Sequence, residues 1–226
     1  MHAPVERREL LGNNVEDTKA LALLDRDGLF MQERRADDGV RSHPVPLATF
    51  GLRLRQAIVA AALERHGRLD ILIHNAGNVR RAPLTSMSYA DFDAVLDVHL
   101  RGAFHVVRPA FPVMCDAGYG RVVLTSSIGG LYGNHEVANY AAAKAGTIGL
   151  SNVVALEGAA HGVVCNAIVP GAVTRMADGL DTSAYPPMDP DLVAPVVGWL
   201  AHETCSVTGE SLIAIAGRVA RVVMAE

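Results

Sequence analysis

Cysteine is scarce in this sequence, and the three that it has stand far apart. Cys115, Cys165 and Cys205 form no C-x-x-C pair and are odd in number, so we expect reduced thiols rather than a disulfide framework. None of the nine histidines falls in an H-E-x-x-H pattern, and the sequence therefore predicts no metal site. Reduced thiols are typical of a reducing compartment, and we expect a cytoplasmic protein.

Long apolar runs are missing as well. No stretch approaches the length of a membrane span, and the first ten residues hold no apolar signal region. The formal net charge of −4 gives no indication of a nucleic-acid or anionic-membrane partner. Aromatic residues make up 5% of the chain although half of it is hydrophobic, so the core should consist mainly of Ala, Val, Leu and Ile. At 226 residues we expect a single domain.

The first 56 residues differ in composition from the rest. They hold 18 of the 44 charged residues and carry only weak apolar signals. Lys19–Leu24 can be read as one helical turn or as a short strand, and Asp25–Gly28 as a turn. We therefore expect a divergent or partly irregular segment over residues 1–56, followed by a regular core over residues 57–226.

From Leu54 onward, short apolar runs alternate with helical periodicity. The expected strands are Leu69–Ile73, Arg121–Thr125, Val163–Val169 and Leu212–Ala216. The expected helices run from Leu54 to Gly67, from Ser88 towards Cys115 with Pro109 and Pro112 bending or interrupting it, from Tyr140 to Gly158, and from Leu192 to Ala201. Between the last strands, Met176–Asp189 should be a loop over the site. The alternation predicts an α/β fold, a doubly wound parallel sheet of Rossmann-like form with helices on both faces.

A serine, a tyrosine and a lysine are the strongest chemical signal. Tyr140 and Lys144 are four residues apart on an expected helix and so share one face, where a cation can lower the phenol pKa from about 10. Ser127 follows a strand, at the edge where such sheets place ligands. The pairing could arise by chance on a solvated helix face. However, Lys19 and Lys144 are the only lysines among twenty basic residues, which favours a use that Arg cannot supply.

These three residues, with Asn75-Ala76-Gly77 upstream and Pro170-Gly171 downstream, resemble the short-chain dehydrogenase/reductase family over roughly Leu63–Gly217. Within the family, three strings resemble most the hydroxyacyl-CoA dehydrogenase branch of the type 2 peroxisomal multifunctional enzymes: Val98–Gly102, Tyr132–Asn134 and Ala194–Glu203. The resemblance implies an NAD(P)-dependent oxidoreductase that interconverts a secondary alcohol and a ketone. It suggests a 3-hydroxyacyl thioester as substrate.

The resemblance also implies roles for single residues. Tyr140 would be the general acid/base, Ser127 would orient the substrate oxygen, and Lys144 would lower the tyrosine pKa and bond the nicotinamide ribose. His99 stands at a relay position, and it is either a relay or a packed helix histidine. The residues expected to line NAD or NADP are Asn75, Ala76, Gly77, Tyr140, Lys144, Pro170, Gly171 and Thr174. A homo-oligomer, dimer or tetramer, is expected.

One landmark of the family cannot be found. Before Ile71 the glycines are Gly12, Gly28, Gly39, Gly51 and Gly67, each at least eleven residues from the next, so no G-x-G-x-x-G turn can be written. Three explanations stay open: a chain start that omits the first strand, a replaced or divergent N-terminal segment, or a relative that no longer turns over. The alternative function is therefore a catalytically silent family member that acts as a subunit or binding module.

Overall fold

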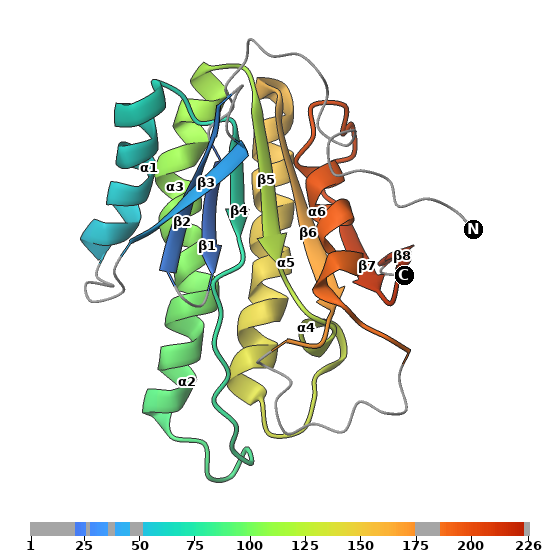
Figure 1. The fold of residues 1–226 in the computed structure, drawn as a ribbon. Helices are drawn as coiled ribbons and strands as arrows, with labels where there is room; N and C mark the ends of the chain where they lie inside the picture. The colour runs from blue at the N-terminus through green and yellow to red at the C-terminus, as the bar shows by residue number, and fades with distance from the viewer. Residues whose placement is uncertain (1–20, 26–27, 36–38, 46–51, 175–185, 224–226) are drawn as a thin grey trace.

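The computed structural model describes residues 21–25, 28–35, 39–45, 52–174 and 186–223. Its centre is one sheet of eight strands (Figure 1). They are β1 (Leu21–Asp25), β2 (Gly28–Arg35), β3 (Gly39–Val45), β4 (Ile71–His74), β5 (Gly120–Thr125), β6 (Val163–Gly171), β7 (Ser211–Ile215) and β8 (Arg218–Arg221). The spatial order is β3-β2-β1-β4-β5-β6-β7-β8, and the five strands from β1 to β7 in that order pair in parallel. The expected α/β fold with a mostly parallel sheet is confirmed.

Helices cover both faces of this sheet (Figure 1). On one face, α1 (Leu52–His66), α3 (Gly102–Asp116) and α5 (Ala138–Gly158) pack on Leu72, Val122 and Leu124. On the other face, α6 (Ala194–Leu200) packs on Ile73, Val123 and Ile168. Neighbouring strand residues thus point to opposite faces, and both faces are buried, which is why the central strands are continuous apolar runs.

The N-terminal segment is more regular than its composition indicates. Leu21–Asp25 is a strand, the second of the two alternatives, and it pairs in parallel with β4. It also pairs antiparallel with β2, in a register that sets Asp25 opposite Gly28. β2 pairs antiparallel with β3 in turn. In the described parts of residues 21–45, β1 is therefore followed by a strand hairpin rather than by a helix. The division of the chain near residue 56 stays a prediction.

The helix expected from Ser88 towards Cys115 is divided by a π-helical turn before either proline is reached. Ser88 caps α2 (Tyr89–Leu96) by accepting a hydrogen bond from the Asp91 N–H. A π-helical turn, η3 (Asp97–Arg101), leads into α3, which contains Pro109 and Pro112 without ending at either. Burial of α3 against the sheet outweighs the hydrogen bonds that the prolines remove.

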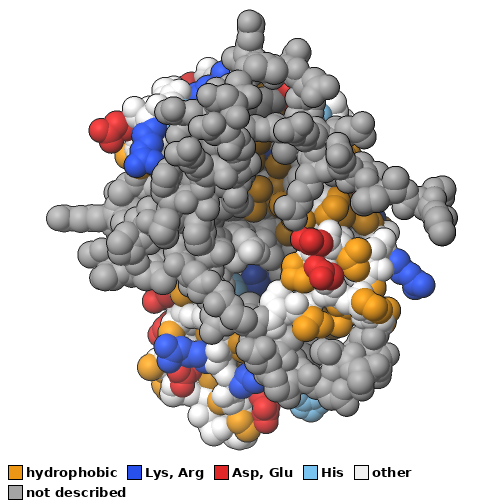
Figure 2. Space-filling view, in the orientation of Figure 1, with side chains coloured by type: hydrophobic (Ala, Val, Ile, Leu, Met, Phe, Trp, Pro, Cys, Tyr) orange, Lys and Arg blue, Asp and Glu red, His pale blue; other side chains and the backbone are white. Residues whose placement is uncertain are grey.

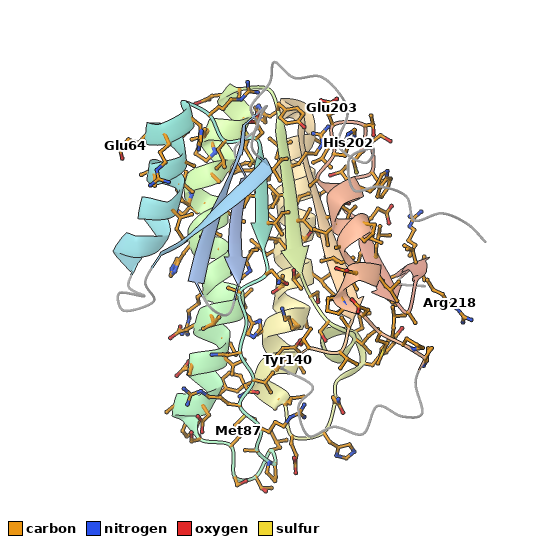
Figure 3. The ribbon with its side chains drawn as sticks, in the orientation of Figure 1. Glu64, Met87, Tyr140, His202, Glu203 and Arg218 are labelled. Carbon is orange, nitrogen blue, oxygen red and sulfur yellow. The ribbon has the colours of Figure 1, made fainter. Side chains whose placement is uncertain are left out.

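A buried arginine ties the amino ends of the strands to the segment after α6. Arg121 has 7% of its surface exposed, and its guanidinium donates to the carbonyl oxygens of Gly120, His202 and Glu203. It also lies 4.5 Å from the centre of the Tyr119 ring. His202 and Glu203 lie at the end of the sheet opposite Tyr140 (Figure 3). The sequence gives no signal for these contacts because the acceptors are backbone atoms distant along the chain.

Smaller differences concern the C-terminal third. The helix expected from Leu192 is a short 3₁₀ turn, η6 (Pro190–Leu192), followed by α6, and the hairpin partner β8 was not expected. Most of the predicted loop over Met176–Asp189 lies outside the described residues. No helix in the described part of the chain is long and apolar enough to cross a membrane.

The packing of α4 (Ile128–Tyr132) on α5 gives a test of this fold. A Cβ at Gly130 would lie 2.7 Å from the backbone and Cβ of Lys144, so Gly130→Ala must push the two helices apart. We expect a loss of about 1–3 kcal/mol in the free energy of unfolding, measured from urea midpoints. Gly149→Ala is the matched control. Nothing lies within 4 Å of its Cβ, and it should be neutral or stabilise α5 by about 0.5–1 kcal/mol. Equal destabilisation by both changes would contradict the packing.

Candidate active site

The candidate residues gather at the carboxyl edge of the parallel strands. β4 leads into Asn75–Gly77, β5 leads into Ser127, and Pro170 and Gly171 form the last two residues of β6. Because these strands are parallel neighbours, their ends meet at one edge. Tyr140, from α5, lies beyond the strand tips (Figure 3). In the same view the described surface is hollowed near its centre, with basic and histidine side chains in the hollow (Figure 2).

The two neighbouring serines have different surroundings. Ser127 caps α4, where its Oγ accepts a hydrogen bond from the Gly129 N–H at 3.1 Å. The Tyr140 ring lies beside it, because a Cβ built on Gly129 would be 3.6 Å from that ring and 3.7 Å from the Ser127 Oγ. Ser126 is buried, and its Oγ donates to the Lys144 carbonyl oxygen at 2.7 Å. The serine beside the tyrosine is therefore Ser127, as its spacing from Tyr140 predicts, and Ser126 anchors α5 to the sheet.

Lys144 lies beneath Tyr140 and is buried, with 4% of its surface exposed. Its Nζ donates to the Thr125 carbonyl oxygen at 2.6 Å and lies 5.6 Å from the centre of the Tyr140 ring. Burial lowers the pKa of Lys144 from its ordinary 10.5 to about 7. The one-turn spacing thus places the amine and the phenol in one space, as the sequence predicts.

The pKa of Tyr140 differs from expectation. Burial raises it above the ordinary value for a phenol, while the hydrogen bond with Ser127 and the positive charge of Arg81 act in the opposite direction. Lys144 is not among the groups that lower it, contrary to the expectation from the sequence. The physical reason is that burial destabilises the ammonium itself, which donates its hydrogen bond to a backbone carbonyl oxygen.

His99 sits on the π-helical turn and packs between the loop after β4 and Tyr140. Its Nε2 lies 3.0 Å from the Asn78 nitrogen and 2.8 Å from the Asn78 oxygen, so the ring bonds this backbone in either tautomer. Its ring meets Tyr140 edge to face, with centroids 5.2 Å apart and an angle of 87°. Burial lowers the pKa of His99 to about 3, so the imidazole is neutral near pH 7.

The contact of His99 with the loop explains one glycine. A Cβ on Gly77 would lie 2.6 Å from Cε1 of the His99 ring, so only a glycine fits beside it. Nδ1 of His99 is buried and has no hydrogen-bond partner among the described atoms. The His99 ring therefore connects the Gly77–Asn78 backbone to Tyr140, whether it acts as a relay or only as a packed histidine.

Asn139 is a site residue that the sequence did not reveal. It is fully buried, and its Nδ2 donates to the carbonyl oxygens of Arg80 and Asp91 at 3.0 and 3.1 Å. Its Oδ1 accepts from the Tyr140 N–H at 2.7 Å. An Asn beside a helix start is a recognisable capping signal, but its partners are 59 and 48 residues away and have no local pattern.

The residues present fit one end of a dinucleotide. Next to the small residues Ala76 and Gly77, Tyr140 and Lys144 offer the hydroxyl and amine donors that a nicotinamide ribose would bond. Pro170 and Gly171 belong to β6 and pair with β7, and Thr174 is exposed beyond them. The pyrophosphate end lacks its usual partner, because β1 continues into β2 and not into a helix whose N-terminus could receive phosphate, within the described part of residues 21–45. Among the residues described, no cluster of His, Cys, Asp or Glu could hold a metal.

Comparison with known proteins agrees with this geometry. A family model described as short chain dehydrogenase matches residues 36–183. The peroxisomal multifunctional enzyme type 2 of Drosophila melanogaster is 45% identical over 161 residues, which are 71% of this chain and 27% of that enzyme. The chain therefore spans about a quarter of the length of this curated relative.

Two shorter relatives are matched over most of their length. The acetoacetyl-CoA reductase of an Acinetobacter strain is 34% identical over 203 residues, 83% of this chain and 80% of that protein. The crystal structure of a short chain dehydrogenase from Mycobacterium avium superimposes with a TM-score of 0.69 at 36% identity, over 77% of this chain and 62% of the other. The fold, the edge-of-sheet site and these matches together show that the chain belongs to the short-chain dehydrogenase family.

Proposed function

We propose that this protein is an NAD(P)-dependent oxidoreductase that interconverts a secondary alcohol and a ketone. The observation that carries the proposal is the arrangement of one phenol, one hydroxyl and one buried amine. The Tyr140 ring and the Ser127 Oγ both border Gly129, and the Lys144 Nζ lies 5.6 Å from the tyrosine ring at the carboxyl edge of the sheet. An exchangeable phenol proton beside a second hydroxyl donor is what a carbonyl oxygen needs when it becomes an alcohol.

Each residue has a distinct part in this mechanism. Tyr140 gives its proton to the substrate oxygen, or takes it from the alcohol, while Ser127 bonds the same oxygen and fixes its direction. Lys144 lies next to the tyrosine ring. His99 packs against this ring, and Asn139 accepts a hydrogen bond from the Tyr140 backbone N–H, so both residues position the tyrosine. NAD(P), when bound, supplies or accepts the hydride. Tyr140, Lys144 and the Asn75–Gly77 loop would hold its nicotinamide end.

A 3-hydroxyacyl thioester and its 3-oxo counterpart are the finer substrate proposal. It is supported by the name of the acetoacetyl-CoA reductase that this chain resembles, and by the match to a multifunctional peroxisomal enzyme. A homo-oligomer, dimer or tetramer, is also proposed. Apolar side chains exposed on α3 and α5 support it, namely Phe104, Val153 and Leu156. The cytoplasmic location stays a prediction.

A catalytically silent binding module is the second candidate, and one observation favours it. In the described residues, the strand that would lead to the phosphate-binding turn continues into β2, so the backbone amides of a helix start are not offered to a pyrophosphate. Under this alternative the Tyr140 cluster is retained without turnover.

Nicotinamide fluorescence on titration with NADH and with NADPH separates the two candidates. If the protein is an oxidoreductase, at least one of the two cofactors should bind saturably. The affinity should be weaker than in family members that have the glycine-rich turn, because the pyrophosphate half of the cofactor lacks its usual hydrogen-bond donors. Free ADP should then compete poorly. The absence of saturable binding by either cofactor would favour the silent module.

Replacing Tyr140 with Phe removes the proposed acid/base group and leaves the ring. We expect turnover of a ketone to fall by at least about 100-fold, because general acid–base catalysis contributes on this scale. The circular dichroism spectrum and urea midpoint should be retained. Tyr132→Phe is the matched control, since Tyr132 is 77% exposed on α4 and its loss should leave the rate unchanged. Full activity in Tyr140→Phe would remove this residue from the mechanism.

Burial of the Lys144 amine makes the stability of the folded protein depend on pH. Its pKa is about 7 in the folded protein and 10.5 ordinarily, so the unfolded chain binds more protons between these values. The free energy of unfolding should therefore rise with pH across this window, and the penalty for burying the charge is fully present below pH 7.

Urea midpoints of the wild type and Lys144→Met, measured at intervals from about pH 6 to about pH 10, check this sign. The difference between the two proteins isolates Lys144, because the other titrating groups are common to both. We expect the wild type to gain stability relative to the variant as the pH rises. A constant difference would show that Lys144 does not titrate in this range.

A further inference from the structure

Arg81 is held beside Tyr140 by the backbone on both of its sides. Its predecessor Arg80 gives its carbonyl oxygen to the Asn139 amide at 3.0 Å. Its successor Ala82 donates its N–H to the Glu136 carbonyl oxygen at 3.0 Å. Both partners lie within the four residues before Tyr140, so the Arg81 backbone is fixed at the start of α5.

Glu136, one of the two residues that bond the backbone beside Arg81, has an unusual conformation. Glu136 has a φ of 61°, in the left-handed region that non-glycine residues seldom adopt. Such a conformation persists where the surroundings impose it, and it clusters at functional sites. Here it turns the Glu136 carbonyl oxygen to the Ala82 N–H, next to Arg81.

The two adjacent arginines have different electrostatic surroundings. Arg80 forms an ion pair with Asp91 at 2.7 Å, and the other oxygen of that carboxylate accepts a hydrogen bond from Ser88. Arg81 is exposed, and no carboxylate in the described part of the chain forms an ion pair with it. Its charge nevertheless reaches the reacting phenol, where it lowers the pKa of Tyr140 against the effect of burial.

We propose that Arg81 binds an anionic group of the substrate while Tyr140 and Ser127 bind its carbonyl oxygen. A guanidinium presents a planar pair of N–H donors that matches two oxygens of a carboxylate or phosphate. This inference rests on the proposed function and adds a substrate class to it. The preferred substrates carry a negative charge, and neutral ketones lack the second point of attachment.

Two sources can supply the anionic oxygens. In a free 3-oxo acid the carboxylate is one carbon away from the keto group, close to the tyrosine. In a coenzyme A thioester the nearest phosphate is separated from the keto group by the whole pantetheine arm. The carboxylate is one arm of the test. The phosphate is the other arm of the test.

Steady-state kinetics of the full chain test the proposal with acetoacetate, acetoacetyl-CoA and neutral ethyl acetoacetate. Arg81→Gln should raise KM about 10- to 100-fold for the anionic substrate that Arg81 binds, because a hydrogen bond to a charged group is worth this much. The KM for ethyl acetoacetate should not change. Arg81→Lys should recover part of the loss, since it keeps the charge without the fork. Arg108→Gln is the matched control: it removes an exposed charge from α3 and should change neither constant.

The outcomes divide clearly. A rise for acetoacetate alone assigns the carboxylate, and a rise for acetoacetyl-CoA alone assigns the phosphate. An equal rise for the neutral ester would overturn the proposal, because Arg81 would then act only by holding Tyr140. No rise for either anion would overturn it as well.

A binding measurement keeps the proposal testable without turnover. The Nε–Hε resonance of Arg81, identified by its loss in Arg81→Gln, should shift saturably on titration with acetoacetate or acetoacetyl-CoA. The Arg108 resonance should stay in place. A saturable shift without turnover would support Arg81 and count against the oxidoreductase. Turnover without a shift from either ligand would overturn Arg81 and leave the oxidoreductase standing.

Discussion

The hydrogen bond from the Lys144 amine to the Thr125 carbonyl oxygen is the contact on which the site depends. It fixes α5 against the tip of β5 from inside, where water does not compete. Ser126 repeats the link from the strand side through the Lys144 carbonyl oxygen. Because the helix is held at this one residue, the phenol one turn earlier and the serine two residues beyond the strand are brought together beside Gly129. The chemistry is thus a consequence of how one helix docks on one strand.

The parts of this site that the sequence predicts are those set by local periodicity. Tyr140 and Lys144 share a helix face because of their spacing. Ser127 follows a short run of apolar residues that predicts a strand. Their meeting at one edge follows from the parallel order of the strands, which the alternation of elements already implies. The roles of Asn139 and Arg121 could not be predicted, because each bonds backbone carbonyls that are distant in the chain.

Two further differences have physical reasons of the same kind. A π-helical turn around His99 divides the long helix, whereas α3 continues through Pro109 and Pro112 because its burial compensates for the donors that they lack. In the N-terminal segment, charged and apolar residues mix without a clear period, yet pairing with β4 and the β2–β3 hairpin gives it strands. Tertiary pairing can overrule weak local preference in this way.

The contact between Gly77 and His99 has a consequence for how this site can change. The backbone of the loop passes so close to the imidazole that position 77 can gain a side chain only if the ring at position 99 becomes smaller. The ring in turn bonds the next peptide of the same loop, so shrinking it first would release that peptide. Neither substitution is harmless alone, and any lineage that replaces one must pass through a weakened intermediate or change both together.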